Sequence, residues 1–290
     1  MKNIVIIGYG DIGNRVAQRY AELSVPVIGV ARSHHAPSVA STPGFSVMKA
    51  DLDLPESLQP LPLRDAVVFY FAPPSGKGIT DSRLRHLLAG ITAENLPQKF
   101  ILISTTAVYG HCSGEWVTES TPVDPQTDRG KRRLDAEQAL QDWSVKVQRD
   151  IVILRVAGIY AADRLPVERL QQKLPILYEH LSPYSNRIHA DDLAMICVAA
   201  AQKAANGAIY NVCDGQPSTM SHYFKSIAKA LDLPAPPEID HEAAQQVMSA
   251  GMLSYLSESR RIHNHKLLDE LGVTLTYPNL DVALAALKPK

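Results

Sequence analysis

Cysteine is scarce in this chain of 290 residues, and the few that occur exclude two common kinds of site. Cys112, Cys197 and Cys213 are odd in number and widely spaced, which fits neither a disulfide framework nor a zinc site. Long apolar runs are lacking too, since the longest after the N-terminus, 194–201, is far below membrane-spanning length. The apolar segment at the N-terminus is itself too short for the core of a signal peptide. We therefore expect a soluble, cytoplasmic protein with neither a bound metal nor a membrane partner.

A surplus of charge of either sign is also absent. Twenty-nine lysines and arginines face 30 aspartates and glutamates, and the net charge is −1 with histidine neutral. Such a balance gives no reason to expect a nucleic-acid partner. Hydrophobic residues make up 46% of the chain, enough for a large core in one or two domains. We therefore expect the partner of this protein to be a small-molecule substrate.

What the sequence does contain, near the N-terminus, is a glycine-rich turn between an apolar and an amphipathic segment. Residues 3–7 are mostly β-branched, which is typical of a strand buried on both faces. The sequence GYGDIG follows at 8–13, and apolar residues recur at helical spacing from Ile12 to Leu23. In such a turn the first glycine permits the tight bend, the second admits a diphosphate, and the third lets helix pack on strand.

We therefore predict that a dinucleotide binds at this turn, with its diphosphate at the start of the helix. The residues expected to contact it are Gly8, Gly10, Asp11, Ile12 and Gly13. The alternative is that the glycines serve packing alone.

The tip of the second predicted strand, 25–30, carries no acidic residue. In folds of this kind an acid at that tip bonds the ribose 2′-hydroxyl of NAD. The segment 31–35 instead contains Arg32, whose charge suits a 2′-phosphate. We therefore expect NADP in preference to NAD, the alternative being that Arg32 is a solvated loop arginine.

Strand and helix patterns alternate along the first 155 residues, and a late strand pattern follows. The predicted strands are 3–7, 25–30, 46–50, 66–71, 100–104, 151–154 and 208–212. The predicted helices are 14–23, 80–90, 131–147, 190–205, 218–231, 241–251 and 264–271. This alternation predicts an α/β fold with a doubly wound parallel sheet, which the last strand rejoins.

The carboxyl ends of the third and fourth strands are expected to border the cofactor crevice. Asp51 lies at the end of the third strand, near the expected adenine, whereas Asp53 is expected to cap the turn that follows. Ala72 and Pro73 begin the loop after the fourth strand, which two prolines stiffen.

Polar side chains also stand at the ends of two later elements. Ser104, Thr105 and Thr106 bring three hydroxyls to the end of the fifth strand, and Ser104 is expected to contact the cofactor. Hydroxyls there can polarise a carbonyl or alcohol of a substrate, or can simply satisfy local backbone groups. Further along, Asp191 and Asp192 are expected to cap the helix that follows them.

Six motifs, in order, resemble the extended short-chain dehydrogenase/reductase superfamily, also called the NAD-dependent epimerase/dehydratase family. They are GYGDIG at 8–13, STTAVYG at 104–110, ESTPVDP at 119–125, LRVAGIY at 154–160, NRIHADDLA at 186–194 and YNVCDGQPST at 210–219. The resemblance implies an NAD(P)-binding Rossmann domain, 1–158, completed by 188–215. It implies a smaller, α-rich substrate lobe, 159–187 plus 216–290, interleaved with the first. Nucleotide sugars are frequent substrates of the family, and a helix-mediated homodimer is a further implication.

The sequence departs from this family at the catalytic pair. Typical members carry Tyr-x-x-x-Lys followed four residues later by a glutamate, and Glu137 aligns with that glutamate. Arg129 then stands at the tyrosine position and Arg133 at the lysine position. Arginine cannot exchange protons near neutral pH, although Arg133 keeps a cation that can donate to a ribose. This loss resembles the atypical, YeeZ-like subgroups of the family.

Three residues are candidates for the chemistry that the missing pair would otherwise perform. Thr105 is expected to polarise the substrate, Tyr109 is the nearest tyrosine for proton transfer, and Arg133 is expected to hold the ribose. In the family, however, the tyrosine of the VYG turn is usually structural. Two functions stay open: an NADP-dependent oxidoreductase or epimerase/dehydratase-like enzyme acting on a nucleotide-sugar or carbonyl substrate, and a non-catalytic NADP(H)-binding sensor or scaffold.

Overall fold

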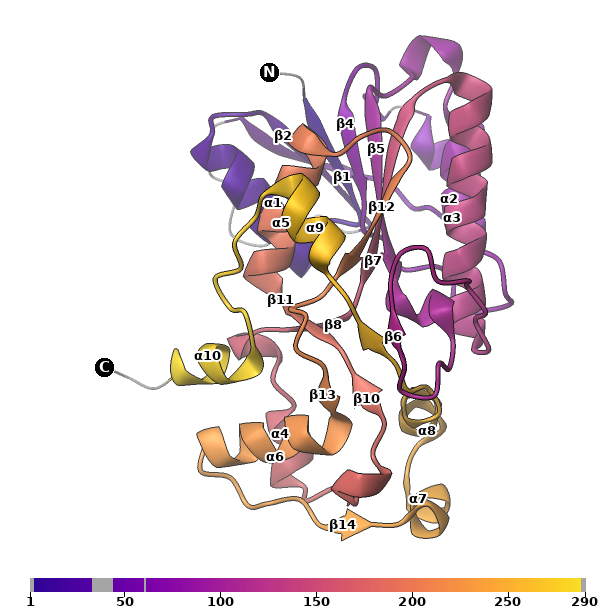
Figure 1. Cartoon of the computed structure of the whole chain (residues 1–290). Helices are drawn as coiled ribbons and strands as arrows, with labels where there is room; N and C mark the ends of the chain where they lie inside the picture. The colour runs from indigo at the N-terminus through magenta and orange to yellow at the C-terminus, as the bar shows by residue number, and fades with distance from the viewer. Residues whose placement is uncertain (1–2, 33–43, 60, 288–290) are drawn as a thin grey trace.

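A sheet of seven parallel strands forms the centre of the protein (Figure 1). The computed structural model describes residues 3–32, 44–59 and 61–287. The strands are β1 (Ile4–Ile7), β2 (Val27–Ala31), β3 (Phe45–Lys49), β4 (Val67–Tyr70), β5 (Lys99–Thr105), β7 (Asp150–Val156) and β12 (Ala208–Val212). Their order across the sheet is β12-β7-β5-β4-β1-β2-β3. The predicted doubly wound α/β fold is therefore confirmed, including the late strand that rejoins the sheet at its edge.

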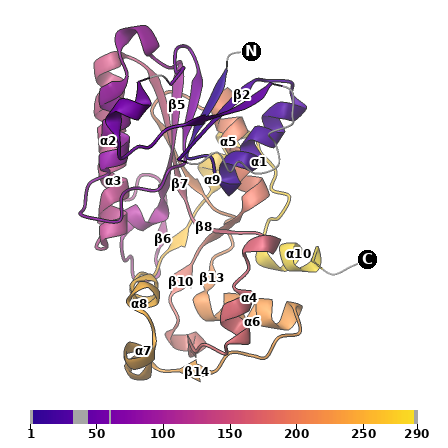
Figure 2. The ribbon, with the colours of Figure 1, turned by 180° about the vertical axis from the view of Figure 1, so that it is seen from behind.

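Helices cover both faces of this sheet (Figures 1 and 2). On one face lie α2 (Ser82–Gly90) and α3 (Asp128–Val147), and on the other lie α1 (Asp11–Glu22), α5 (Ala190–Lys203) and α9 (His265–Leu271). Alternate residues of β1 pack into opposite layers, Ile4 and Ile6 into one and Val5 and Ile7 into the other. Full burial of such a side chain stabilises the folded state by about 1.5–3 kcal/mol. Because both faces of β1 are buried, its residues are all apolar instead of alternating with polar ones.

The direction of winding reverses beside β1, and this reversal positions a crevice. From β1 the chain proceeds outward through β2 and β3, then returns to place β4 on the other side of β1. The loops after β1 and β4 therefore diverge at the carboxyl edge of the sheet. Ligands of doubly wound sheets bind at such a point.

A smaller part of the chain lies beyond the carboxyl ends of the strands (Figures 1 and 2). Its helices are α4 (Val167–Gln171), α6 (Met220–Ala230), α7 (His241–Val247), α8 (Ala250–Leu256) and α10 (Leu280–Ala285). Its strands are two or three residues long: β8 (Gly158–Tyr160), β9 (Ile176–Leu177), β10 (Tyr184–Ser185), β11 (Arg187–His189), β13 (Ser218–Thr219) and β14 (Glu238–Ile239). The division into 1–158 with 188–215, and 159–187 with 216–290, stays a prediction.

Several element boundaries differ from the sequence prediction. Helix α3 begins at Asp128 rather than at 131, because the Thr127 hydroxyl accepts the Gly130 N–H as its N-cap. The single helix predicted over 241–251 is divided into α7 and α8, and Ser249 caps the second of them. The predicted helix 218–231 begins with a short strand, and α10 has no counterpart in the prediction.

The predicted capping roles of three aspartates are wrong. Asp53 does not cap the 3₁₀ turn at Pro55–Leu58, because its carboxylate binds Arg83 through two bonds of 2.8 and 2.6 Å. At α5 the cap is His189, whose Nδ1 accepts the Asp191 N–H. Asp192 instead accepts two backbone N–H groups, those of residues 276 and 277.

None of the helices formed by the described residues combines the length and the apolar character needed to cross a membrane.

Candidate functional site

Two of the three glycines in the turn after β1 are explained by packing within the protein. Gly8 has φ of +86°, and a Cβ there would lie 2.4 Å from the backbone nitrogen of Ala72. A Cβ on Gly13 would lie 3.0 Å from a methyl carbon of Ile6. Gly10 is different, because the nearest atom to its Cβ position is the Gly8 carbonyl oxygen at 4.0 Å. The turn therefore leaves open space at Gly10 that no protein contact requires.

The helix that follows this space has an uncapped N-terminus. Gly10 is the N-cap of α1, and no side chain of the described residues caps it. Free N–H groups at a helix N-terminus attract anions, and those of Asp11, Ile12 and Gly13 border the space beside Gly10. The backbone of this turn therefore fits a diphosphate, as a Rossmann turn requires.

The Asp11 side chain faces arginines within the protein. Its carboxylate accepts from Arg15 at 2.9 Å and from Arg164 at 2.7 Å. Burial opposes ionisation of this group, but the hydrogen bonds from Arg164 and Arg15 outweigh it and lower the pKa of Asp11. Arg15 also pairs with Asp191 and Asp163. The carboxylate of Asp11 is thus neutralised next to the open space.

At the outer end of the crevice, Arg32 and Asp51 occupy neighbouring strand ends. Arg32 follows β2 and is exposed, while residues 33–35 of the predicted tip lie outside the described residues. The Asp51 carboxylate accepts the Asp53 N–H at 3.0 Å. Arg83 binds Asp53 and also donates to the Pro73 carbonyl at 3.0 Å. One guanidinium therefore ties the loop after β3 to the loop after β4.

Arg133 lies buried below the loop after β4. It donates to the Ala72 carbonyl from both terminal nitrogens at 3.3 Å, and one of these lies 3.8 Å from Asp81. Burial lowers the pKa of Arg133, and the charge of Asp81 acts in the opposite direction. The guanidinium thus supports the loop that packs on Gly8, and only 13% of its side chain is exposed.

Ser104 and Tyr109, both predicted site residues, are instead bonded inside the core. The Ser104 hydroxyl donates to Glu137 at 2.5 Å, and Glu137 also forms a buried ion pair with Arg155 at 2.8 Å. The Tyr109 hydroxyl donates to Asn211 at 2.7 Å and accepts from Arg155 at 3.0 Å. Neither hydroxyl is free to reach a ligand. These side chains brace the ends of β5 and β7, and the site roles expected of them stay predictions.

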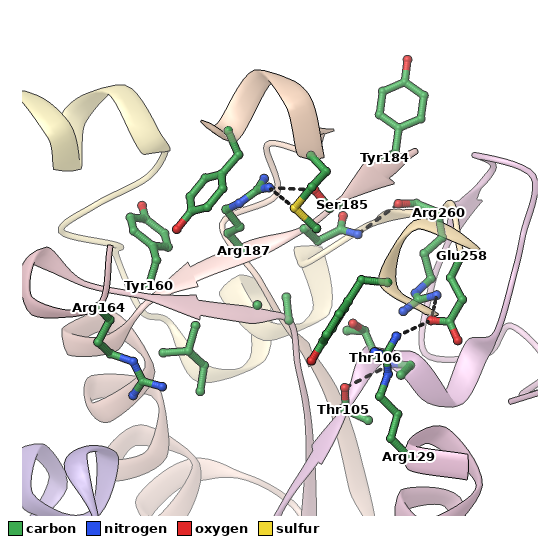
Figure 3. A pocket seen from close by; sticks show the side chains of 18 residues that line it. Thr105, Thr106, Arg129, Tyr160, Arg164, Tyr184, Ser185, Arg187, Glu258 and Arg260 are labelled. Carbon is green, nitrogen blue, oxygen red and sulfur yellow. Dashed lines mark hydrogen bonds and ion pairs between the residues drawn. The ribbon is translucent and has the colours of Figure 1, made fainter. Parts of the chain in front are cut away.

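Thr105, by contrast, borders a cavity of about 440 Å³ at the carboxyl ends of β5 and β7 (Figure 3). Its hydroxyl accepts the Ala107 N–H at 3.2 Å, and Thr106 lies beside it in the same wall. The charged side chains that line the cavity are Arg129, Arg164, Arg187, Arg260 and Glu258. Four guanidinium groups against one carboxylate make the cavity strongly cationic.

Arg187 is the most deeply buried of these cations, with 6% of its surface exposed. It donates to the hydroxyls of Ser218 and Ser185 at 3.0 and 2.8 Å, and its guanidinium lies 3.9 Å from the centre of the Tyr223 ring. Among the described residues no carboxylate lies within ion-pair distance of it. Burial lowers the pKa of Arg187 to about 10, so it remains charged at neutral pH. A buried cation without a counter-ion favours an anionic ligand.

The other end of the cavity holds a network around Glu258 (Figure 3). This carboxylate accepts from Arg260 at 2.9 Å, from Arg129 at 3.4 Å and from the Thr127 hydroxyl at 3.3 Å. Arg129, in the first turn of α3, also lies with its guanidinium 3.8 Å from the centre of the Tyr255 ring. The arginines of the basic run 129–133 therefore lie in different surroundings: Arg129 lines the cavity, and Arg133 supports the loop after β4.

A comparison with protein families agrees with this combination of sheet, glycine turn and cavity. The model of the NAD dependent epimerase/dehydratase family matches residues 4–213. The chain belongs to this family.

Solved structures similar to this epimerase/dehydratase family member share its whole length. A conserved protein of unknown function from Silicibacter pomeroyi is 26% identical, with a TM-score of 0.80 over 99% of this chain and 98% of that chain. A dTDP-glucose 4,6-dehydratase from Bacillus anthracis, solved in complex with NAD, is 18% identical, with a TM-score of 0.79 over 99% of this chain and 95% of that chain. The latter likeness shows the fold alone.

Similarity to curated relatives covers less. A dTDP-D-glucose 4,6-dehydratase from Homo sapiens is 25% identical over 135 residues, which are 44% of this chain and 39% of that protein. The matched part therefore spans well under half the length of this relative.

Several cavity residues of this family member were not predicted from the sequence. Arg187 lies in the motif NRIHADDLA, which indicated the family but no ligand contact. Tyr255, Glu258 and Arg260 belong to a segment without a motif, and only the folded chain brings them to Arg129. Two adjacent arginines and an acid between 254 and 261 were the available signal.

Proposed function

We propose that the protein binds NADP, or NAD, between β1 and β4 and is an oxidoreductase or epimerase-like enzyme for an anionic small molecule. As the family resemblance implies, we include a homodimer in this proposal. The observation that carries it is the position of the arginine-lined cavity, which begins at Thr105 and Thr106 beside the cofactor crevice. A nicotinamide cofactor, when bound, supplies hydride chemistry, and the protein supplies binding and orientation.

The roles within the cofactor site follow from the contacts described above. Gly10 and the N-terminus of α1 would receive the diphosphate, and Gly8 and Gly13 keep the turn close to its neighbours. Arg32 would face a 2′-phosphate, which is our reason to keep NADP ahead of NAD. Arg133 acts through Ala72, by holding the loop against the glycine turn.

The substrate class follows from the cavity. Guanidinium groups form paired hydrogen bonds with phosphate or carboxylate, and Arg187 has no carboxylate partner among the described residues. Similar proteins are named for nucleotide sugars, whose phosphates are anionic, and one was solved with UDP-glucose. An anionic nucleotide sugar or carbonyl compound is therefore the substrate class that we propose.

A second function is favoured by one specific observation. Arg129 and Arg133 occupy the positions of the family's tyrosine and lysine, and neither can transfer a proton. A sensor or scaffold that binds NADP(H) without turnover needs no proton-transferring residue at either position.

The experiment combines cofactor binding with turnover of UDP-glucose, dTDP-glucose, UDP-glucuronic acid and a neutral ketone. We expect turnover of an anionic member, and we expect Thr105→Ala to lower kcat by about 100-fold because a donor to the developing oxyanion is lost. Thr92→Ala, which does not line the cavity, is the matched control and keeps full activity. Tight NADPH binding with no turnover of any compound would contradict the enzyme and support the sensor.

A further inference from the structure

The proposed reaction requires a group that gives and takes a proton, and the arginines at the family's catalytic positions cannot do so. Five side chains that line the cavity carry a phenol or a carboxylate, the groups there that can exchange a proton with a substrate most readily. They are Tyr160, Tyr184, Tyr223, Tyr255 and Glu258. The contacts of each decide which one can serve.

Two of the five are committed to other partners. Tyr160 is almost fully buried, and its hydroxyl donates to the Asn279 carbonyl at 3.4 Å. Burial raises the pKa of Tyr160, which further disfavours release of its proton. Glu258 accepts hydrogen bonds from two guanidinium groups, Arg260 and Arg129, which hold its carboxylate as a structural anion.

Two further tyrosines lie away from the Thr105 end of the cavity. Tyr223 packs on Arg187, at the end that we assign to the anionic group of the substrate. Burial also raises the pKa of Tyr223, although the charge of Arg187 acts against it. The ring of Tyr184 faces Arg261, with the guanidinium 5.0 Å from its centre, on a strand of the smaller part.

Tyr255 remains, and its neighbour is the residue that replaces the family's tyrosine. It comes from α8, and its ring centre lies 3.8 Å from the guanidinium carbon of Arg129. Both residues line the cavity with Thr105 and Thr106. Tyr255 is 55% exposed, and within the described part of the chain its hydroxyl makes no hydrogen bond. A phenol whose hydroxyl has no partner among the described residues therefore lies against the residue that replaces the family's tyrosine.

We propose that Tyr255 is the residue that transfers the proton. Arg129 positions the Tyr255 side chain through the contact of its guanidinium with the ring. This inference rests on the proposed function and names the acid/base group of the same site. The guanidinium against the ring stabilises the negative charge that develops on the phenol as its proton leaves. The pair of phenol and cation that the family builds within one helix is thus assembled here from α8 and α3.

The step balances in atoms and electrons. In the reductive direction the substrate carbon gains a C–H bond from the hydride of the reduced nicotinamide, which is oxidised, and the carbonyl becomes an alkoxide. The O–H bond of Tyr255 breaks, and its proton forms the O–H bond of the product alcohol. Because Tyr255 is exposed, the phenolate regains its proton from water.

The test is Tyr255→Phe in the full chain, which keeps the ring on Arg129 and removes only the hydroxyl. Tyr178→Phe is the matched control, since Tyr178 is also an exposed tyrosine but does not line the cavity. With the compound that the wild type converts best, we expect kcat of Tyr255→Phe to fall by about 100-fold or more. KM and NADPH affinity should stay unchanged, and so should every parameter of Tyr178→Phe.

The outcomes separate this inference from the proposed function. Wild-type turnover with an unimpaired Tyr255→Phe would overturn the role of Tyr255 and leave the enzyme standing. Loss of kcat in Tyr223→Phe, with Tyr255→Phe unimpaired, would overturn it in favour of Tyr223. A wild type that binds NADPH and converts nothing would overturn the enzyme itself, and the inference with it.

Discussion

Arg32 is the residue on which the choice between NADP and NAD depends. It is exposed at the end of β2, where the sequence offers no acid to a ribose 2′-hydroxyl. A charge-assisted hydrogen bond contributes about 1.5–3 kcal/mol, and replacing the cation by an anion adds repulsion toward a 2′-phosphate.

We predict that Arg32→Glu lowers the affinity for NADP by about 10- to 100-fold and changes the affinity for NAD much less. Isothermal titration with both cofactors measures the difference. Arg64→Glu makes the same change of charge on the loop before β4 and should leave both affinities as they are. Equal losses for NADP and NAD in Arg32→Glu would mean that Arg32 does not recognise the phosphate.

At the scale of single residues, the sequence indicates residue types but not the direction of side chains. The three hydroxyls at the end of β5 look equivalent in the sequence, yet Ser104 points to Glu137 and only Thr105 and Thr106 reach the cavity. Successive side chains of a strand point to opposite faces, so Ser104 and Thr105 diverge. The buried Glu137 carboxylate then holds the Ser104 hydroxyl. The partner of Asp53, 30 residues away on α2, was equally absent from the local pattern that suggested a cap.

At the scale of elements, the turn after β12 joins the sheet to the smaller part and contains a buried acid. The backbone N–H of Asp214 donates to the Arg187 carbonyl at 2.8 Å, and its carboxylate accepts the Gln216 N–H at 2.9 Å. Burial raises the pKa of Asp214 from 3.8 to about 7, against the opposing effects of the Gln216 N–H and Arg187.

This shift has a consequence for stability. Between pH 4 and 7 the folded state holds a proton at Asp214 that the unfolded chain has lost, so stability falls as the pH rises through that window. The contribution is at most about 1.4 kcal/mol per pH unit. We predict that Asp214→Asn weakens this dependence, because the amide cannot ionise and still accepts the Gln216 N–H.

Urea unfolding at pH 5 and at pH 8 provides the measurement. The decrease in unfolding free energy from pH 5 to pH 8 should be smaller in Asp214→Asn than in the wild type. Asp142→Asn, at an exposed position on α3, is the control and should behave as the wild type does. The same loss in Asp214→Asn and the wild type would show that Asp214 does not titrate in this window.

Elements with strong local signals were predicted, and short ones were not. The inner sheet strands are apolar runs rich in β-branched and aromatic residues with neighbouring strands on both sides, so their pattern is local. The strands of the smaller part are two or three residues long and depend on partners far along the chain, as β14 (Glu238–Ile239) does on β9 (Ile176–Leu177). The predicted helix 241–251 ended before Tyr255, because Ser249, which caps α8, was read as a residue inside one longer helix.

At the scale of the whole molecule, the cofactor site and the cavity differ in how far the sequence reveals them. The crevice depends on one turn and on the reversal of strand order, both of which follow from the early strand and helix patterns. The cavity is assembled from the end of β5, the residue after β7, α3 and segments between 158 and 260, so its cationic character emerges only when these meet. The catalytic role predicted for Tyr109 stays a prediction, and its hydroxyl is bonded to Asn211 and Arg155, whereas the glycine turn has the open space that a diphosphate needs.

The most direct test of a dinucleotide at this turn is calorimetric titration of NADPH and NADH into the wild type and Gly10→Val. The backbone at Gly10 is extended, with φ of −117°, so it can accept valine. Within the described residues, and leaving out the two chain neighbours, the nearest atom to a Cβ at Gly10 is the Gly8 carbonyl oxygen at 4.0 Å. We predict that Gly10→Val keeps the unfolding temperature of the wild type and loses binding of both cofactors, because the side chain fills the space of the diphosphate. A folded Gly10→Val that binds as the wild type does would contradict the account.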